Sequence, residues 1–200
     1  MKADAAKVCK IIKKCPRLLS IIDVTKYPMM AAEYRRIFSM CGNPYVDACL
    51  RKLCSLGIFR VPSKARYGKV LVFTETGREA KRLRCKELGR EYDYCESGMQ
   101  SDEYRIYSEV ASSRRRRKII KAMREEYETF TQIYRKTKDF SFDTVNRSLR
   151  HFLDFGIVVQ EKPRGRYRLN KKGVKIRDFI NKIDEIQESQ EKEETAEFSY

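Results

Sequence analysis

Residues 43–77, NPYVDACLRKLCSLGIFRVPSKARYGKVLVFTETG, have the pattern of a helix, a glycine, two short strands and the start of another helix. Asn43 is a good helix N-cap, and Pro44 suits the first helical position, where no backbone N–H is needed. Gly57 stands where a glycine commonly ends a helix. Between these ends, helical spacing holds for Val46, Cys49, Leu50, Leu53 and Leu56. Residues 58–61 and 70–73 then predict the two strands of a hairpin around a basic turn.

Residues 141–173 repeat this plan with different amino acids. Ser141 is the expected cap, Gly156 the expected stop, and the apolar stripe consists of Val145, Leu149, Phe152 and Phe155. The second pair of strands is predicted at 157–160 and 166–169, and a helix restarts at 170–173. Residues 53–59 align with 152–158 without a gap, and 34–36 align with 134–136. The chain therefore contains an internal repeat.

The two copies resemble winged helix-turn-helix proteins, namely MarR-like and related prokaryotic regulators. The resemblance is carried by Leu56-Gly57-Ile58 and Phe155-Gly156-Ile157, by the basic hairpins, and by the segments 73–78 and 169–173. It implies a mainly α fold with small β-hairpins, arranged as two tandem winged helix-turn-helix domains. It also implies binding of double-stranded DNA, with the third helix of each unit in the major groove and the hairpin, or wing, on the backbone or in the minor groove.

The expected domains are residues 1–96, which include a connector helix, and residues 102–186, which end in a helix. The polar segment 96–101 is the predicted break. Further helices are expected around 5–14, 28–40 and 75–95, whereas 18–22 could form a helical turn or a strand. An apolar stripe at Ile176, Phe179, Ile180, Ile183 and Ile186 is a candidate homodimer contact, with packing inside its own domain as the alternative. Residues 187–200 are acidic and expected to be disordered.

Charge is distributed in a way that favours a polyanionic partner. Residues 1–100 carry 21 basic and 10 acidic side chains, residues 101–183 carry 22 and 11, and residues 184–200 carry one lysine and seven acids. Both repeats are thus strongly basic and only the last segment is acidic, which is typical of a nucleic-acid-binding protein. The alternative is a basic surface with no special partner.

Candidate DNA contacts follow from removing the core stripe of each repeated helix. The first helix then offers Tyr45, Arg51 and Lys52, and the second offers Thr144, Asn146, Arg147, Arg150 and His151. Arginine can contact guanine, asparagine can contact adenine, and any of these cations can reach phosphate. The hairpins add phosphate candidates at Lys64, Arg66, Lys69, Lys162, Arg164, Arg166 and Arg168. Each of these residues could instead be an ordinary solvated side chain, as could the run Arg114–Lys118.

The two hairpins differ on their predicted outward faces. Aligning Gly77 with Gly173 places Val70 and Val72 opposite Arg166 and Arg168. We therefore expect the first sheet to be covered by another part of the protein or by a second subunit. The second sheet is expected to face solvent or DNA.

Other function classes find little support in the sequence. The single histidine, the absence of a phosphate-cradling glycine loop and the clustering of acids in the last segment predict no enzyme and no catalytic residue. Seven cysteines without a CxxC pair predict neither a metal site nor a cofactor. No targeting or membrane segment is visible, so a cytoplasmic, nucleoid-associated location is expected. The main alternative to DNA-binding transcription regulation is a protein-interaction scaffold in a transcription or nucleic-acid-processing assembly, which apolar Val70 and Val72 favour.

Overall fold

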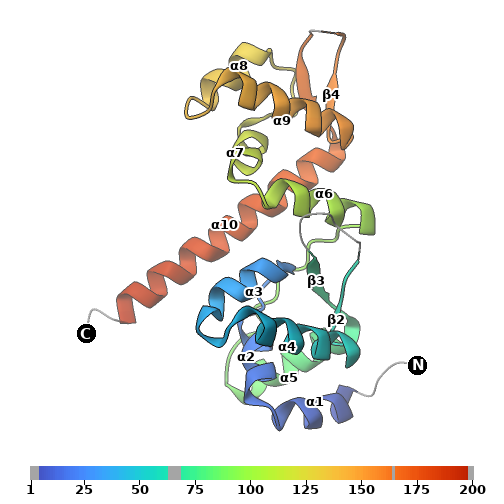
Figure 1. The fold of residues 1–200 in the computed structure, drawn as a ribbon, viewed down its shortest axis with the longest axis vertical. Coiled ribbons are helices and arrows are strands. Elements are labelled where there is room, and N and C mark those ends of the chain that lie inside the picture. The colour runs from blue at the N-terminus through green and yellow to red at the C-terminus, as the bar shows by residue number, and fades with distance from the viewer. Residues whose placement is uncertain (1–4, 63–68, 164, 198–200) are drawn as a thin grey trace. The chain divides into compact units, whose positions relative to one another are not determined.

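The computed structural model describes residues 5–62, 69–163 and 165–197 of the 200-residue chain. The chain is mainly helical, with small antiparallel sheets (Figure 1). It divides into two compact units, Met1–Ser108 and Glu109–Tyr200. This division falls inside helix α6 (Ser101–Ala111), whereas the sequence places the break at 96–101. One reason is that the start of α6 belongs to the first unit, where the hydroxyls of Tyr104 and Ser97 lie 2.5 Å apart.

The first unit combines helices with a three-stranded sheet. Its elements are α1 (Ala5–Lys13), α2 (Pro16–Val24), β1 (Met29–Met30), α3 (Ala31–Ile37), the 3-10 turn η1 (Ser39–Cys41), α4 (Asn43–Ser55), β2 (Phe59–Arg60), β3 (Val70–Phe73) and α5 (Glu75–Glu87). The strands are antiparallel in the order β1-β3-β2. The expected helix at 28–40 is therefore shorter, because Met29 and Met30 pair with Leu71 and Val70. The N-cap of α4 is Gly42, not Asn43.

The second unit repeats this order. After α6 come α7 (Arg114–Ala122), α8 (Phe130–Lys136), α9 (Phe142–Asp154), β4 (Val158–Gln160), β5 (Tyr167–Leu169) and α10 (Lys171–Glu197). Strands β4 and β5 are antiparallel. Glu128 bridges Tyr167 through two backbone hydrogen bonds of 2.8 and 2.7 Å, just before α8. This bridge occupies the place that β1 has before α3, and the sequence pattern predicts neither.

The same backbone contacts close both repeats. The N–H of Ile58 donates to the carbonyl of Leu53 at 2.9 Å, and that of Ile157 donates to Phe152 at 3.0 Å. The carbonyl oxygens of Ile58 and Ile157 then accept from the residues that begin the next helices, Thr74 at 3.0 Å and Asn170 at 3.2 Å. The side chains of Thr74 and Asn170 in turn accept from the backbone of Gly77 and Gly173. A helix, a strand pair and the following helix are thereby joined at one point in each unit.

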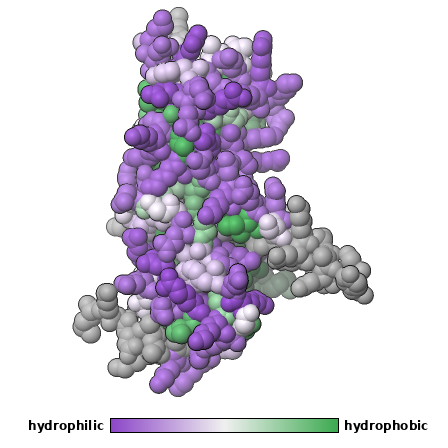
Figure 2. Space-filling model, turned by 180° about the vertical axis from the view of Figure 1, so that it is seen from behind, coloured by the Kyte–Doolittle hydropathy of each residue, from purple (hydrophilic) through white to green (hydrophobic). Residues whose placement is uncertain are grey.

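The apolar stripe near the end of the second unit lies on α10 and is mostly buried within that unit. Ile176, Phe179, Ile180 and Ile183 are all buried, and α10 packs against α7. Intradomain packing, the alternative to a dimer contact, thus accounts for four of the five stripe residues. The helix continues to Glu197, through most of the acidic segment whose composition predicts disorder. The face of the molecule shown in Figure 2 is largely hydrophilic, with small hydrophobic patches, as expected when apolar side chains lie in the cores.

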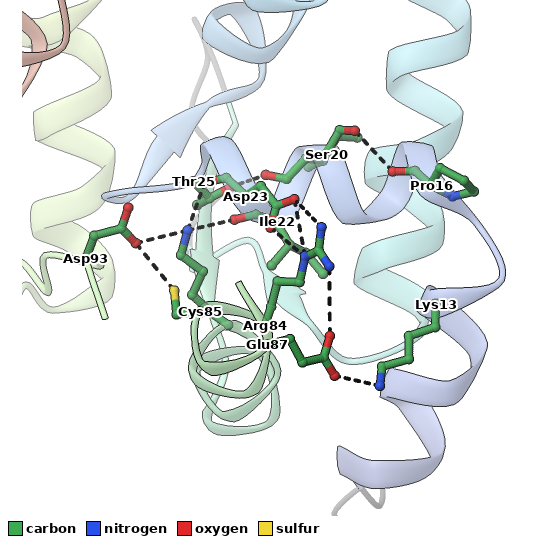
Figure 3. Close-up of polar contacts among 12 residues, drawn as sticks. Lys13, Pro16, Ser20, Ile22, Asp23, Thr25, Arg84, Cys85, Glu87 and Asp93 are labelled. Atoms are coloured by element: carbon green, nitrogen blue, oxygen red, sulfur yellow. Dashed lines mark hydrogen bonds and ion pairs between the residues drawn. The ribbon is translucent and has the colours of Figure 1, made fainter. Parts of the chain in front are cut away.

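A buried lysine ties α5 to the end of α2. Lys81 is only 2% exposed, and its ammonium donates to the carbonyls of Ile22 at 3.2 Å and Asp23 at 2.8 Å. Asp93 lies 3.0 Å from the same ammonium. A cation at the carbonyl end of a helix is favoured by the helix dipole. Beside it, Arg84 contacts Asp23 and Glu87, and Glu87 also contacts Lys13 of α1 (Figure 3).

We expect Lys81→Met to lower the free energy of unfolding of the first unit by about 2 kcal/mol, because the substitution removes the ammonium that contacts two backbone carbonyls and the Asp93 carboxylate. Urea unfolding followed by circular dichroism measures this change. Lys86→Met is the matched control, since Lys86 is exposed on the same helix. Equal effects of the two substitutions would contradict a structural role for the buried ammonium.

Candidate nucleic-acid interface

Helix α4 carries two exposed cations and a tyrosine that already has a hydrogen-bond partner within the chain. Arg51 and Lys52 are exposed, as predicted. Tyr45 is half-buried, and its hydroxyl accepts a hydrogen bond of 2.6 Å from Arg17 of α2. The Arg17 guanidinium also lies 4.7 Å from the centre of the tyrosine ring, and the hydrogen bond raises the pKa of Arg17. Tyr45 is thus held against α2, which leaves Arg51 and Lys52 as the more accessible side chains of this helix.

An ion pair fixes α3 against α4. Arg35 donates to both carboxylate oxygens of Asp47 at 2.9 Å, and this hydrogen bonding raises the pKa of Arg35. Bidentate pairs of this kind hold two helices in a defined orientation. Helical periodicity alone places Asp47 on the outer side of α4 and does not reveal this ion pair. Alignment of the repeats places Arg135 and Asn146 at the equivalent positions, so the second unit lacks this carboxylate.

Helix α9 exposes a larger polar set. Val145, Leu149 and Phe152 are buried, whereas Arg147, Arg150 and His151 are exposed. The His151 ring stacks on Phe155 at a centroid distance of 6.2 Å. Asn146 and Thr144 are half-buried. Thr144 belongs to the helix cap, because its N–H donates to the Ser141 hydroxyl at 3.4 Å.

The two hairpins differ as their aligned sequences predict. Val70 and Val72 are 2% and 6% exposed, so this chain itself covers the first sheet and no second subunit is needed. Arg166 and Arg168 are exposed in the second unit, and the Arg168 guanidinium lies 4.9 Å from the centre of the Tyr127 ring. Lys69 and Lys162 are also exposed. The predicted phosphate contacts Lys64, Arg66 and Arg164 lie outside the described residues.

Carboxylates form ion pairs with part of the basic run of α7. Asp184 of α10 pairs with Arg117 and, at 2.7 Å, with Lys121. Lys118 pairs with Asp139, and this hydrogen bond lowers the pKa of that carboxyl. Arg114 and Arg115 remain exposed. Arg117 and Lys118 of the run are therefore engaged in ion pairs, whereas Arg114 and Arg115 are accessible.

An exposed group of aromatic rings lies at the start of α9, and none of its residues is among the candidate contacts predicted from the sequence. Phe130 and Tyr134 of α8 surround Phe142, the first residue of α9, with ring centroids 4.3 and 5.9 Å from the Phe142 ring. We call these three residues the aromatic cluster. Phe142 is 56% exposed. Phe142 stands three residues before Val145 and seven before Leu149, so helical spacing places it in line with the buried stripe of α9, at the exposed start of the helix.

The described residues offer no metal centre. No group of three or more potential ligands comes together among them, and the six cysteines in this part of the chain are free thiols. Cys49 is buried in the core, as its place on the α4 stripe predicts.

None of the helices in the described part of the chain combines the length and apolar character that a membrane crossing requires. No family model, curated protein or solved structure matches the chain.

Proposed function

We propose that this chain is a double-stranded DNA-binding protein, acting as a transcriptional regulator in the cytoplasm and associated with the nucleoid. Its two units serve as tandem winged helix-turn-helix domains, with α4 and α9 in the major groove and the two hairpins on the DNA backbone. The observation that carries the proposal is the exposure of Arg147 and Arg150 on α9 together with Arg166 and Arg168 on the adjoining hairpin. No carboxylate among the described residues forms an ion pair with these four arginines.

Unpaired arginines on one helix and its neighbouring hairpin suit a duplex, because phosphates line both edges of the groove that a helix enters. The two units present different side chains to the DNA, since α4 has Arg51 and Lys52 where α9 has Arg150 and His151. A sequence-specific site would consequently be asymmetric, with its stronger half under the second unit.

The alternative function, a protein-interaction scaffold, rests in the sequence on Val70 and Val72. Both side chains are buried within the chain and offer nothing to a partner. The aligned positions in the second unit carry arginines, which favour a polyanion. DNA binding is therefore the better-supported proposal.

The first experiment is binding of the full chain to a mixed-sequence duplex across a range of salt concentrations, measured by fluorescence anisotropy. The logarithm of the affinity should fall linearly with the logarithm of salt, with a slope of about 0.9 per neutralised phosphate. Failure to bind the duplex even at low salt would overturn the proposal.

We expect the double substitution Arg150→Ala plus Arg166→Ala to weaken duplex binding by about tenfold or more and to reduce the salt slope by about two contacts. Arg114→Ala plus Arg115→Ala is the matched control, because it removes the same charge from exposed arginines of α7 in the same unit. If both double variants lose affinity equally, net charge alone determines binding and the assignment of α9 and its hairpin is wrong.

A further inference from the structure

The aromatic cluster is an unusual surface for a unit whose core is otherwise well covered. Phe142 is more than half exposed although it contacts two other rings, and Phe130 and Tyr134 are only half-buried. Grouped aromatic side chains at a surface are typical of interaction sites, because they provide a large apolar contact area with little loss of conformational freedom. The aligned position in the first unit is Asn43, so the cluster belongs to the second unit alone.

Three exposed cations lie on the two helices that carry this cluster or just beyond the end of one of them. Arg135 follows Tyr134 on α8, and Lys138 lies just beyond the end of the same helix. On α9, Arg150 is exposed a little over two helical turns after Phe142. None of these three cations pairs with a carboxylate in the part of the chain that the structure describes. The surface thus combines apolar rings with unneutralised positive charge, and a complementary partner would be acidic with aromatic anchors.

Residues 188–200 of the same chain have that composition. They contain five glutamates and one lysine, and they include Phe198 and Tyr200. Among the side chains of α10 that the structure describes, the last buried one is Ile183, and the helix continues to Glu197. At about 1.5 Å per residue this extension is about 21 Å long. Within the second unit α10 runs away from α8 and α9 (Figure 1), so its residues 188–197 extend away from the aromatic cluster of the same chain.

We propose that residues 188–200 of one copy of the chain dock on the aromatic cluster of a second copy. The glutamates lie against Arg135, Lys138 and Arg150, and the rings of Phe198 and Tyr200 pack on Phe130, Tyr134 and Phe142. Each copy carries both a donor segment and an acceptor surface, so the contact is heterologous and can link copies in series. If the proposed function holds, the docked segment also covers Arg150 and competes with DNA for α9.

The test is the self-association of the full chain without DNA, followed by sedimentation velocity over a concentration series. The unmodified chain should associate, and raised salt should weaken the association because charges contribute to it. Phe198→Ala plus Tyr200→Ala should weaken it at least tenfold, as expected when buried ring area is lost. Phe142→Ser should have a similar effect from the acceptor side.

Leu88→Ser is the matched control, because Leu88 is an exposed apolar residue of the first unit, 41% exposed. It should leave association unchanged. A chain that stays monomeric at concentrations on the order of 100 μM, or association that survives substitution of Phe198 and Tyr200, would overturn the proposal. Since these two substitutions follow Glu197, the last described residue of α10, they test the proposal separately if Phe142→Ser unfolds the chain. The assay contains no DNA, so its failure is distinct from a failure of duplex binding.

Discussion

Gly173→Ala is expected to lower the free energy of unfolding of the second unit by about 3 kcal/mol or more. Alanine in place of glycine normally stabilises a helix by about 1 kcal/mol. Here the added Cβ would lie well under 3.0 Å from the carbonyl oxygen of Ile157, which already accepts the Asn170 N–H. Because that oxygen belongs to the backbone, the chain must shift, and the hydrogen bond from the Asn170 N–H to the Ile157 carbonyl must weaken. Urea unfolding of the purified variant measures the loss.

Lys171→Ala is the companion variant for this measurement, since Lys171 is exposed in the first turn of the same helix. It should change the unfolding free energy by less than about 0.5 kcal/mol. Gly77→Ala should destabilise the first unit in the same way, because its Cβ would meet the carbonyl oxygen of Ile58. A Gly173→Ala protein as stable as the parent would show that the two elements can separate without cost.

Val72→Arg should unfold the first unit, with a loss of more than about 4 kcal/mol. The substitution introduces the residue that the repeat carries at the aligned position, Arg168, but Val72 is buried. Its opposite neighbour on β2 is another arginine, Arg60, so the buried guanidinium would find like charge across the strands. An uncompensated buried charge is among the most destabilising single changes. Hydrogen exchange measured by mass spectrometry would show the loss of protection in residues of the first unit.

The reciprocal variant, Arg168→Val, tests the same asymmetry from the other side. Arg168 is exposed and its guanidinium lies over the Tyr127 ring, so the substitution should cost no more than about 1 kcal/mol. Comparable tolerance at both positions would mean that the two hairpins are not covered differently.

The principal helices could be predicted from the sequence because their signals are local. The apolar spacing around Leu50 and Leu149, together with Gly57 and Gly156, determines where α4 and α9 lie and end. Strand β1 and the bridge at Glu128 could not be found in this way. Each is one or two residues long, and its existence depends on a partner strand about 40 residues away in sequence.

The candidate interface was predictable to a similar degree. Removing the core stripe correctly left Arg147 and Arg150 exposed, because helical periodicity determines which side of a packed helix faces out. Helical periodicity could not reveal that Arg17 donates a hydrogen bond to the Tyr45 hydroxyl or that Asp184 pairs with Arg117, since those partners are 28 and 67 residues apart. DNA binding itself stays a prediction that the salt titration tests.

The carbonyl oxygens of Ile58 and Ile157 have a consequence for how such a unit can diverge. Each oxygen belongs to the main chain, so the junction places almost no demand on the Ile58 or Ile157 side chain beyond being apolar. Threonine and asparagine serve equally at the facing position, where Thr74 and Asn170 make the same bonds. Only the absence of a side chain at Gly77 and Gly173 is strictly required. The two repeats can thus differ in their surface residues while this junction stays the same.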